Sequence, residues 1–290
     1  MRPIIRVANK IFGFVYDKNK KSFKELRELL QKADITIPVR SYVSLSIFIS
    51  CIVFLLSLFS IPVLLNFFSF PFYLRLSISI FAPLSLALLI FALLIFYPYH
   101  KASKRAKDIE SNLPFALTHM GAIAEAGVPP YVIFKLISRF REYGEISREM
   151  KKITKNIEVL GLDTISAVKR VARRTPSDKF RQILEGIVTT TESGGNIAYF
   201  LKSVGQQSLF EWRIKRQRFI QQLSTYAEIY TGILVAAPLF VISLLSVLSL
   251  IQPNLGGYDI LTLAKFAVYG LIPALNLGFL LFLKLTEVEI

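Results

Sequence analysis

Long runs of apolar residues alternate with charged segments along the chain, and this pattern predicts four membrane-spanning helices. A helix needs about 20 apolar residues to cross the hydrocarbon core of a bilayer. Four segments meet this requirement, the third being apolar from Thr231 onward: Tyr42–Asn66, Leu76–Tyr97, Glu228–Ile251 and Phe266–Leu283. Short links join the first segment to the second and the third to the fourth. We therefore expect two pairs of spans.

The segment between the two pairs, residues 100–224, shows helical spacing without an alternating strand pattern. Glycine, proline and capping residues divide it into six predicted helices, the first beginning after the basic run at Lys107. The last begins near Ile197 and continues into the third span. Six antiparallel helices joined by short links predict a compact bundle. The expected fold class is therefore all-α: a polytopic membrane protein with four transmembrane helices and a six-helix bundle between the second and third.

Charged residues lie mostly outside the apolar segments. The chain of 290 residues has 35 Lys and Arg and 20 Asp and Glu, a net charge of +15. Most of the basic residues lie in the first 40 residues and in the segment between the pairs, so the positive-inside rule places both, and both termini, in the cytoplasm. We expect a multi-pass protein of the cell membrane with four regions: a basic cytoplasmic arm (1–41), a transmembrane pair (42–99), a cytoplasmic bundle (100–225) and a second pair with a cytoplasmic C-terminus (226–290).

Residues typical of catalysis or metal binding are few and scattered. Cys51 is the only cysteine, and His100 and His119 are the only histidines. An intramolecular disulfide and a paired-cysteine zinc site are therefore excluded. The chain has no HExxH, GxSxG or Walker motif and no paired carboxylates in an apolar setting. We predict no enzymatic activity, no metal and no cofactor.

Three basic clusters are candidates for binding partners. The clusters at Lys101–Lys107 and Arg213–Arg218 flank predicted spans, where they indicate either contact with anionic lipid or simple orientation signals. Their position next to a membrane argues against nucleic acid as a partner. The third cluster falls toward the distal links of the bundle and indicates either a docking surface for an acidic cytoplasmic partner or a solvated basic face. Its candidate residues are Arg148, Lys151, Lys152, Lys155, Arg173 and Arg174.

Small residues mark two further features. The turns Glu125–Pro129 and Glu192–Asn196 lack the spacing of a phosphate loop and are typical of helix ends capped by a left-handed glycine. Within the predicted spans, small residues four apart allow close helix packing, either inside the chain or against another copy. These residues are Gly232 and Ala236 in the third span and Gly270, Ala274 and Gly278 in the fourth.

Several short motifs follow one another in a distinctive order between the two pairs of spans. They are Leu113–Leu117, Ala124–Pro129, Gly161–Ala167, Glu192–Asn196, Leu201 and Arg213–Arg218. Together they resemble the type II secretion F-domain family, the membrane platform proteins of type IV pili, archaeal flagella and type II secretion machines. The resemblance covers about Leu113–Leu245. The single bundle resembles the shorter tight-adherence pilus branch, which implies that a second copy or a paralogue completes the platform.

The resemblance implies a non-catalytic platform that couples a cytoplasmic hexameric ATPase to the insertion or extraction of pilin-like subunits. The implied partners are that ATPase, pilin-like subunits, the protein itself or a paralogous platform protein, and membrane lipid. The two turns would shape the tip of the bundle or its pairing with a second bundle, through Glu125, Gly127, Pro129, Glu192, Gly194 and Gly195. One alternative is a small-solute transporter or channel, which predicts inverted repeats and ionisable groups at mid-membrane that the sequence lacks. Another is a membrane-bound regulatory protein whose bundle binds a cytoplasmic partner.

Overall fold

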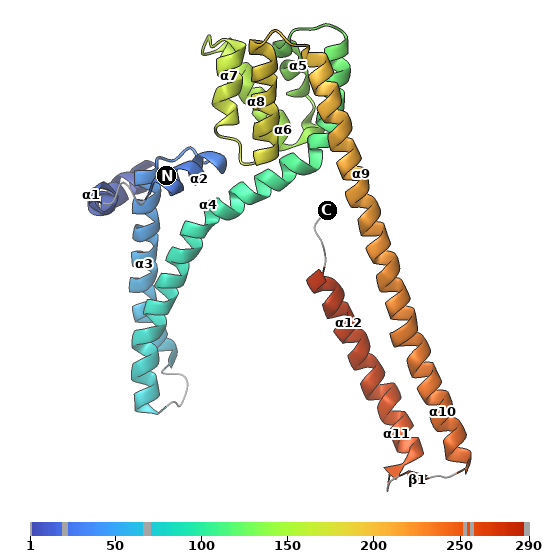
Figure 1. Ribbon diagram of the computed structural model, residues 1–290. Coiled ribbons are helices and arrows are strands. Elements are labelled where there is room, and N and C mark those ends of the chain that lie inside the picture. The colour runs from blue at the N-terminus through green and yellow to red at the C-terminus, as the bar shows by residue number, and fades with distance from the viewer. Residues whose placement is uncertain (1, 19–22, 66–70, 252–253, 256–257, 287–290) are drawn as a thin grey trace. The chain divides into compact units, whose positions relative to one another are not determined.

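The computed structural model describes residues 2–18, 23–65, 71–251, 254–255 and 258–286 (Figure 1). Nearly all of them are helical, which confirms the predicted all-α fold. Short links join the helices, and two-residue strands, β1 (Asn254–Leu255) and β2 (Tyr258–Asp259), pair with each other. The chain divides into two compact units, Met1–Ser208 and Leu209–Ile290.

The first unit contains the helices up to the beginning of α9, and a 3₁₀ turn, η1, follows α5. Their bounds are α1 (Arg2–Lys18), α2 (Lys24–Lys32), α3 (Val39–Leu65), α4 (Phe72–Glu125), α5 (Pro130–Ile137), η1 (Arg141–Tyr143), α6 (Glu145–Glu158), α7 (Thr164–Ala172), α8 (Asp178–Glu192) and α9 (Ile197–Ile229).

The four predicted spans lie in four helices that are long and apolar enough to cross a membrane: Val39–Leu65, Tyr73–Glu125, Ile197–Ile251 and Ile260–Thr286. One expectation was wrong: the first helix of the bundle, predicted to begin at Lys107, is not separate from the second span. Both belong to α4, which continues for 54 residues through Pro83, Pro98 and Pro114. The basic run consists mainly of alanine, lysine and arginine, which favour helix and do not break it.

Buried serines line one face of α3 where it packs against α4. Ser46, Ser50 and Ser57 share this face with Tyr42, whose hydroxyl donates a hydrogen bond to the Leu94 carbonyl of α4 at 2.6 Å. Ser46 and Ser50 donate to the carbonyls four residues earlier, so their hydroxyls are satisfied within the helix. Small residues allow two helices to approach closely. The first pair of spans therefore packs through serines.

The end of α4, helices α5 to α8 and the start of α9 pack around one hydrophobic core. Phe134 and Phe180 are among its largest fully buried side chains. The helix starts are set by capping: the Asp163 carboxylate accepts from the Ser166 amide at 2.9 Å, and the Ser177 hydroxyl accepts from the Phe180 amide at 3.2 Å. These caps fix where α7 and α8 begin, and α7 then packs against α6.

Two glycines bring the backbones of α4 and α9 into close contact. A Cβ atom on Gly205 would lie 3.1 Å from the Leu117 carbonyl carbon and the Thr118 nitrogen. On the other helix, a Cβ atom on Gly121 would lie 3.2 Å from the Lys202 backbone. Each helix therefore has a glycine where the backbone of the other helix approaches it.

The second unit contains the rest of α9 and the remaining elements: the π-helical turn η2 (Tyr230–Ala236), α10 (Ala237–Ile251), α11 (Ile260–Phe266), the π-helical turn η3 (Ala267–Leu271) and α12 (Ile272–Thr286). Each π turn ends two residues before a proline, Pro238 or Pro273. A proline ring clashes with the carbonyl four residues earlier, and a wider turn relieves that clash. Residues 252–253 and 256–257, in the predicted link between the third and fourth spans, lie outside the described residues.

Candidate docking site

The six predicted docking residues lie on two helices that pack against each other. Arg148, Lys151 and Lys155 follow one another at spacings of three and four, so they share an exposed face of α6. Arg173 and Arg174 directly follow α7 and are exposed. Of these residues, Lys152 and Arg174 border one cavity, whereas Arg148 and Lys151 border a different one.

The six predicted docking residues differ in whether they form ion pairs within the chain. Lys152 forms ion pairs with Asp34 at 2.9 Å and with Glu149 at 3.0 Å, and Arg148 pairs with Glu145. Among the residues that the structure describes, Lys151 and Lys155 form no ion pair, and neither do Arg173 and Arg174. Lys152 therefore contributes to the packing of the fold, whereas the unpaired residues remain available to a partner.

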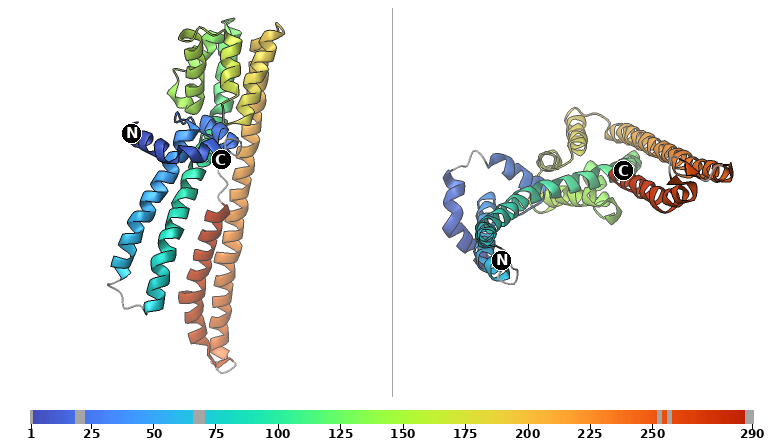
Figure 2. Two further views of the ribbon diagram at one scale, coloured as in Figure 1. Left: turned by 90° about the vertical axis from the view of Figure 1, so that its left-hand side faces the viewer. Right: turned by 90° about the horizontal axis from the view of Figure 1, so that it is seen from below.

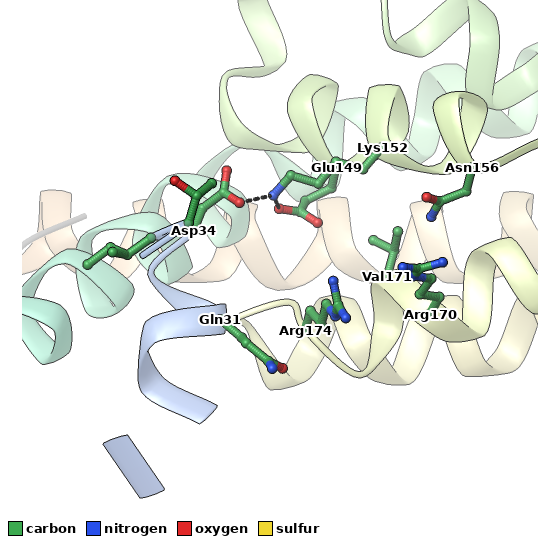
Figure 3. A pocket seen from close by; sticks show the side chains of 10 residues that line it. Gln31, Asp34, Glu149, Lys152, Asn156, Arg170, Val171 and Arg174 are labelled. Atoms are coloured by element: carbon green, nitrogen blue, oxygen red, sulfur yellow. Dashed lines mark hydrogen bonds and ion pairs between the residues drawn. The ribbon is translucent and has the colours of Figure 1, made fainter. Parts of the chain in front are cut away.

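A cavity of about 240 Å³ opens between the link from α2 to α3 and helices α6 and α7 (Figure 3). Arg170 and Arg174 border it from α7, and Lys152 and Asn156 border it from α6. Guanidinium groups bind carboxylates and phosphates through paired hydrogen bonds. The cavity is therefore suited to an acidic side chain of a partner. Its other lining residues are Gln31, Asp34, Ile35, Thr36, Glu149 and Val171.

A second hollow, of about 330 Å³, lies beside the start of α6. Arg141, Arg148 and Lys151 supply its basic side chains, with Ser138, Gly144 and Ser147. The sequence prediction did not include Asn156, which borders the first cavity. Helical spacing identifies residues that share one helix face, but it does not show which links pack beside that face.

A buried arginine of α4, Arg105, contacts α6 and the end of α2. The Arg105 guanidinium is 2.7 Å from a carboxylate oxygen of Glu145 and 2.5 Å from one of Glu149, and it also donates to the Lys32 carbonyl. Burial alone would lower the pKa of Arg105, but the two carboxylates raise it, so the side chain stays charged. Arg105 is only 6% exposed. Within the basic run Lys101–Lys107, Arg105 thus contacts protein groups and is not available to lipid.

Asp34 joins the link after α2 to α6. It has a positive φ of 53°, which aspartate tolerates better than most residues, and its carboxylate pairs with Lys152. Burial alone would raise the pKa of Asp34, but the hydrogen bond and charge of Lys152, with the charges of Arg105 and Lys101, lower it below the usual value. The negative form therefore holds the N-terminal arm against the bundle.

The two predicted turns each combine a left-handed glycine with an ion-paired glutamate. Gly127 has a φ of 73° and Gly194 one of 68°. Glu125 pairs with Lys202 at 2.5 Å, and Glu192 pairs with Lys169 at 2.5 Å. The turns lie at the same end of the bundle (Figure 1). Pro129 is the N-cap of α5, and a Cβ atom on Gly195 would approach Thr190 at 3.1 Å.

The predicted small-residue faces of the third and fourth spans are not where these helices meet. No described atom lies within 4 Å of a Cβ built on Gly232 or Gly278, and Ala236 and Ala274 are exposed. Gly270 approaches only the Phe266 ring of its own helix. The π turns shift the register, so spacings of four residues no longer define a straight face. Packing of these faces against another copy stays a prediction.

Contacts between η2 and α12 use larger side chains. The Tyr230 hydroxyl donates to the Asn276 side-chain oxygen at 3.3 Å, and the Tyr230 ring lies 5.4 Å from that of Phe279. Tyr226 and Phe282 form an edge-on ring pair at 5.7 Å. Aromatic rings and one amide therefore connect the second pair of spans.

Comparison with known proteins agrees with the order of motifs. The chain is 30% identical over 158 residues to an uncharacterised protein of Methanocaldococcus jannaschii, a match that covers 54% of this chain and 27% of the relative. It is 24% identical over 194 residues to flagella accessory protein J of the same organism, covering 67% of this chain and 34% of the relative. Flagella accessory protein J of Methanococcus voltae is also 24% identical, over 187 residues, 64% of this chain and 33% of the relative.

The chain thus spans about a third or less of the length of these relatives. No solved structure matches it. Residues 116–245, from the end of α4 through the bundle and into α10, match the family described as Type II secretion system (T2SS), protein F. This match confirms the resemblance to that family for the part of the chain that it covers.

Proposed function

We propose that this protein is the non-catalytic membrane platform of a type IV pilus-like or type II secretion-like assembly machine. It spans the cell membrane four times, with both termini and a six-helix bundle in the cytoplasm, and it couples a hexameric ATPase to the insertion or extraction of pilin-like subunits. The observation that carries this proposal is the match of residues 116–245 to the protein F family, a segment that runs from the end of the second of four apolar helices into the third.

The basic surface on α6 and α7 is the proposed contact for the ATPase. Lys151 and Lys155 supply unpaired charge on α6, and Arg173 and Arg174 supply it after α7. The adjacent cavity offers Arg170 to an acidic side chain of the partner. Unpaired charges that face a complementary surface accelerate association and fix orientation. In this proposal, the ATPase presents acidic residues to this surface.

We propose that a second copy or a paralogue takes part in the platform, with the turns at Gly127 and Gly194 shaping the bundle end that meets it. The exposed small residues Gly232 and Gly278 offer a membrane face for the same pairing.

The test is the affinity of the full protein for the secretion-type ATPase of the same cell, measured over a series of salt concentrations. We expect binding that weakens with salt. The double variant Lys151→Glu/Lys155→Glu should bind several-fold more weakly and with a smaller salt dependence. The matched control is Lys24→Glu/Arg27→Glu on α2, which changes the net charge equally at exposed positions.

The control variant should bind as the unmodified protein does. Equal loss in both variants would show that net charge, and not this surface, determines binding. Unchanged affinity in the α6 variant would remove the docking surface from the proposal. Absence of binding by the full unmodified protein would contradict the platform function itself.

A further inference from the structure

Helix α1 has an apolar stripe that is about half exposed or more. Val7, Ile11 and Phe14 are 48%, 56% and 69% exposed. Their spacings of four and three residues place them on one side of the helix. Exposing such a stripe to water is unfavourable, and exposed apolar patches often mark a surface that contacts a membrane or another protein.

A different side of α1 packs against the beginning of α3. The Asn9 side-chain amide donates to the Ser41 hydroxyl at 2.9 Å, and Asp17 pairs with Arg40 at 2.9 Å. A Cβ atom on Gly13, between them in the helix, would lie 3.0 Å from the Arg40 guanidinium. Three successive turns of α1 thus contact the same turn of α3, as they do when two helices cross.

Figures 1 and 2 show this crossing, with α1 lying crosswise at the end of α3. That end is the start of the apolar helix Val39–Leu65. If α3 spans the membrane, as proposed above, α1 lies at the depth where the span enters the headgroup region. The contacts with Arg40 and Ser41 fix it at that depth.

Basic residues border the stripe. Arg6 and Lys10 are exposed on the side of α1 next to Val7. A helix with an apolar stripe beside lysine and arginine binds in the plane of a membrane interface, where anionic lipid headgroups neutralise the basic residues. The surface of an anionic bilayer provides both an apolar environment for the stripe and negative charge for the basic residues, whereas water provides neither.

We propose that α1 is an interfacial helix that inserts Val7, Ile11 and Phe14 into the acyl boundary of an anionic leaflet, with Arg6 and Lys10 among the headgroups. The first helix of the arm is then bound to the membrane and is not a free cytoplasmic segment. Its contacts with α3 would hold the arm, and through Asp34 the bundle, at a defined height above the bilayer.

The test uses nitroxide spin labels on single cysteines in the full protein, with Cys51→Ser as the background, reconstituted into vesicles of phosphatidylglycerol and phosphatidylcholine. Labels at Val7→Cys and Ile11→Cys should collide with lipid-soluble oxygen several-fold more than with a water-soluble nickel complex. The matched control, Arg6→Cys, should show the reverse. A label at Leu56→Cys, exposed within α3, reports independently whether that helix is in the membrane.

Nickel accessibility at Val7 and Ile11 equal to that at Arg6, with Leu56 in lipid, would overturn the interfacial helix while leaving the proposed function intact. A water-accessible Leu56 would overturn both. Protection of Val7 and Ile11 from both reagents, with dipolar broadening between labels, would show that a second copy covers the stripe and would also overturn the proposal. Lys10→Glu should move the Val7 label toward water in anionic vesicles only, and an equal shift in pure phosphatidylcholine would contradict the role of anionic lipid.

Discussion

Single buried charges connect the parts of the first unit. Arg105 contacts Glu145 and Glu149 from α6 and the last turn of α2, so one side chain of α4 links the arm to the bundle. Glu149 is only 2% exposed. A buried carboxylate that loses its partner is strongly destabilising, even where the intact pair adds little net stability.

Replacing Arg105 with methionine should therefore lower the free energy of unfolding by about 3–5 kcal/mol, because two carboxylates lose their buried counter-charge and keep only the more exposed Arg148 and Lys152. Thermal unfolding of the detergent-solubilised protein measures this loss. Arg148→Met is the matched control, since that exposed arginine pairs with the same Glu145 and should contribute less than about 1 kcal/mol. Similar losses in the two variants would show that Arg105 is not the buried link described here.

Gly205 is required by the approach of two backbones. Gly205→Leu should lower the free energy of unfolding by about 1–3 kcal/mol, because the new side chain meets the backbone at Leu117 and Thr118. Gln206→Leu introduces the same side chain at the next, exposed position and should be close to neutral. Chemical denaturation of both variants distinguishes them. Equal stability would refute the close crossing of α4 and α9.

At the level of elements, the attachment of the arm to α6 depends on pH through Asp34. Its pKa is lowered in the folded protein, so its contribution is complete above the unfolded pKa of about 4 and is lost as pH falls through the folded value. Asp34→Asn, which also tolerates a positive φ, should be less stable than the native protein at pH 7 by less than about 1 kcal/mol, because the pair with Lys152 is partly exposed. Thermal unfolding across pH should show the difference vanish in acid. A difference that persists there would contradict the ion pair.

The C-terminus of α8 depends on the left-handed conformation of Gly194. Gly194→Val should lower stability by about 1–2 kcal/mol, since a β-branched residue is disfavoured at this φ although the space around it is open. Gly194→Asn should lose less, because asparagine adopts this conformation more readily. Circular dichroism melts of the two variants give the comparison, and an unchanged valine variant would show that the cap does not constrain the helix end.

The spans and most helix ends of the bundle could be predicted because each depends on local sequence. Apolar length identified the spans, and Asp163, Ser177 and Gly194 marked helix ends. The role of Arg105 could not be predicted, because a charge in a basic run becomes buried only when α2 and α6 pack around it. The small-residue faces at Gly232 and Gly270 were displaced by π turns, which depend on how a proline distorts the preceding turn.

At the scale of the whole molecule, the protein combines a rigid helical core with helices long enough to cross a bilayer. Its charges are divided between internal links, such as Arg105 and Lys152, and unpaired residues on the surface of α6 and α7. In the proposed platform, the internal links would transmit a displacement that a motor applies to the unpaired surface. Within the described residues, no group of three or more metal-binding side chains comes together.

Photocrosslinking in cells tests the central claim, that the α6 and α7 surface receives the ATPase, most directly. A photoreactive amino acid at Lys155 or Arg173 should crosslink to the secretion-type ATPase, while the same probe at Glu185, exposed on α8, should not. Crosslinks to the ATPase from position 185 and none from positions 155 and 173 would contradict the proposed docking surface.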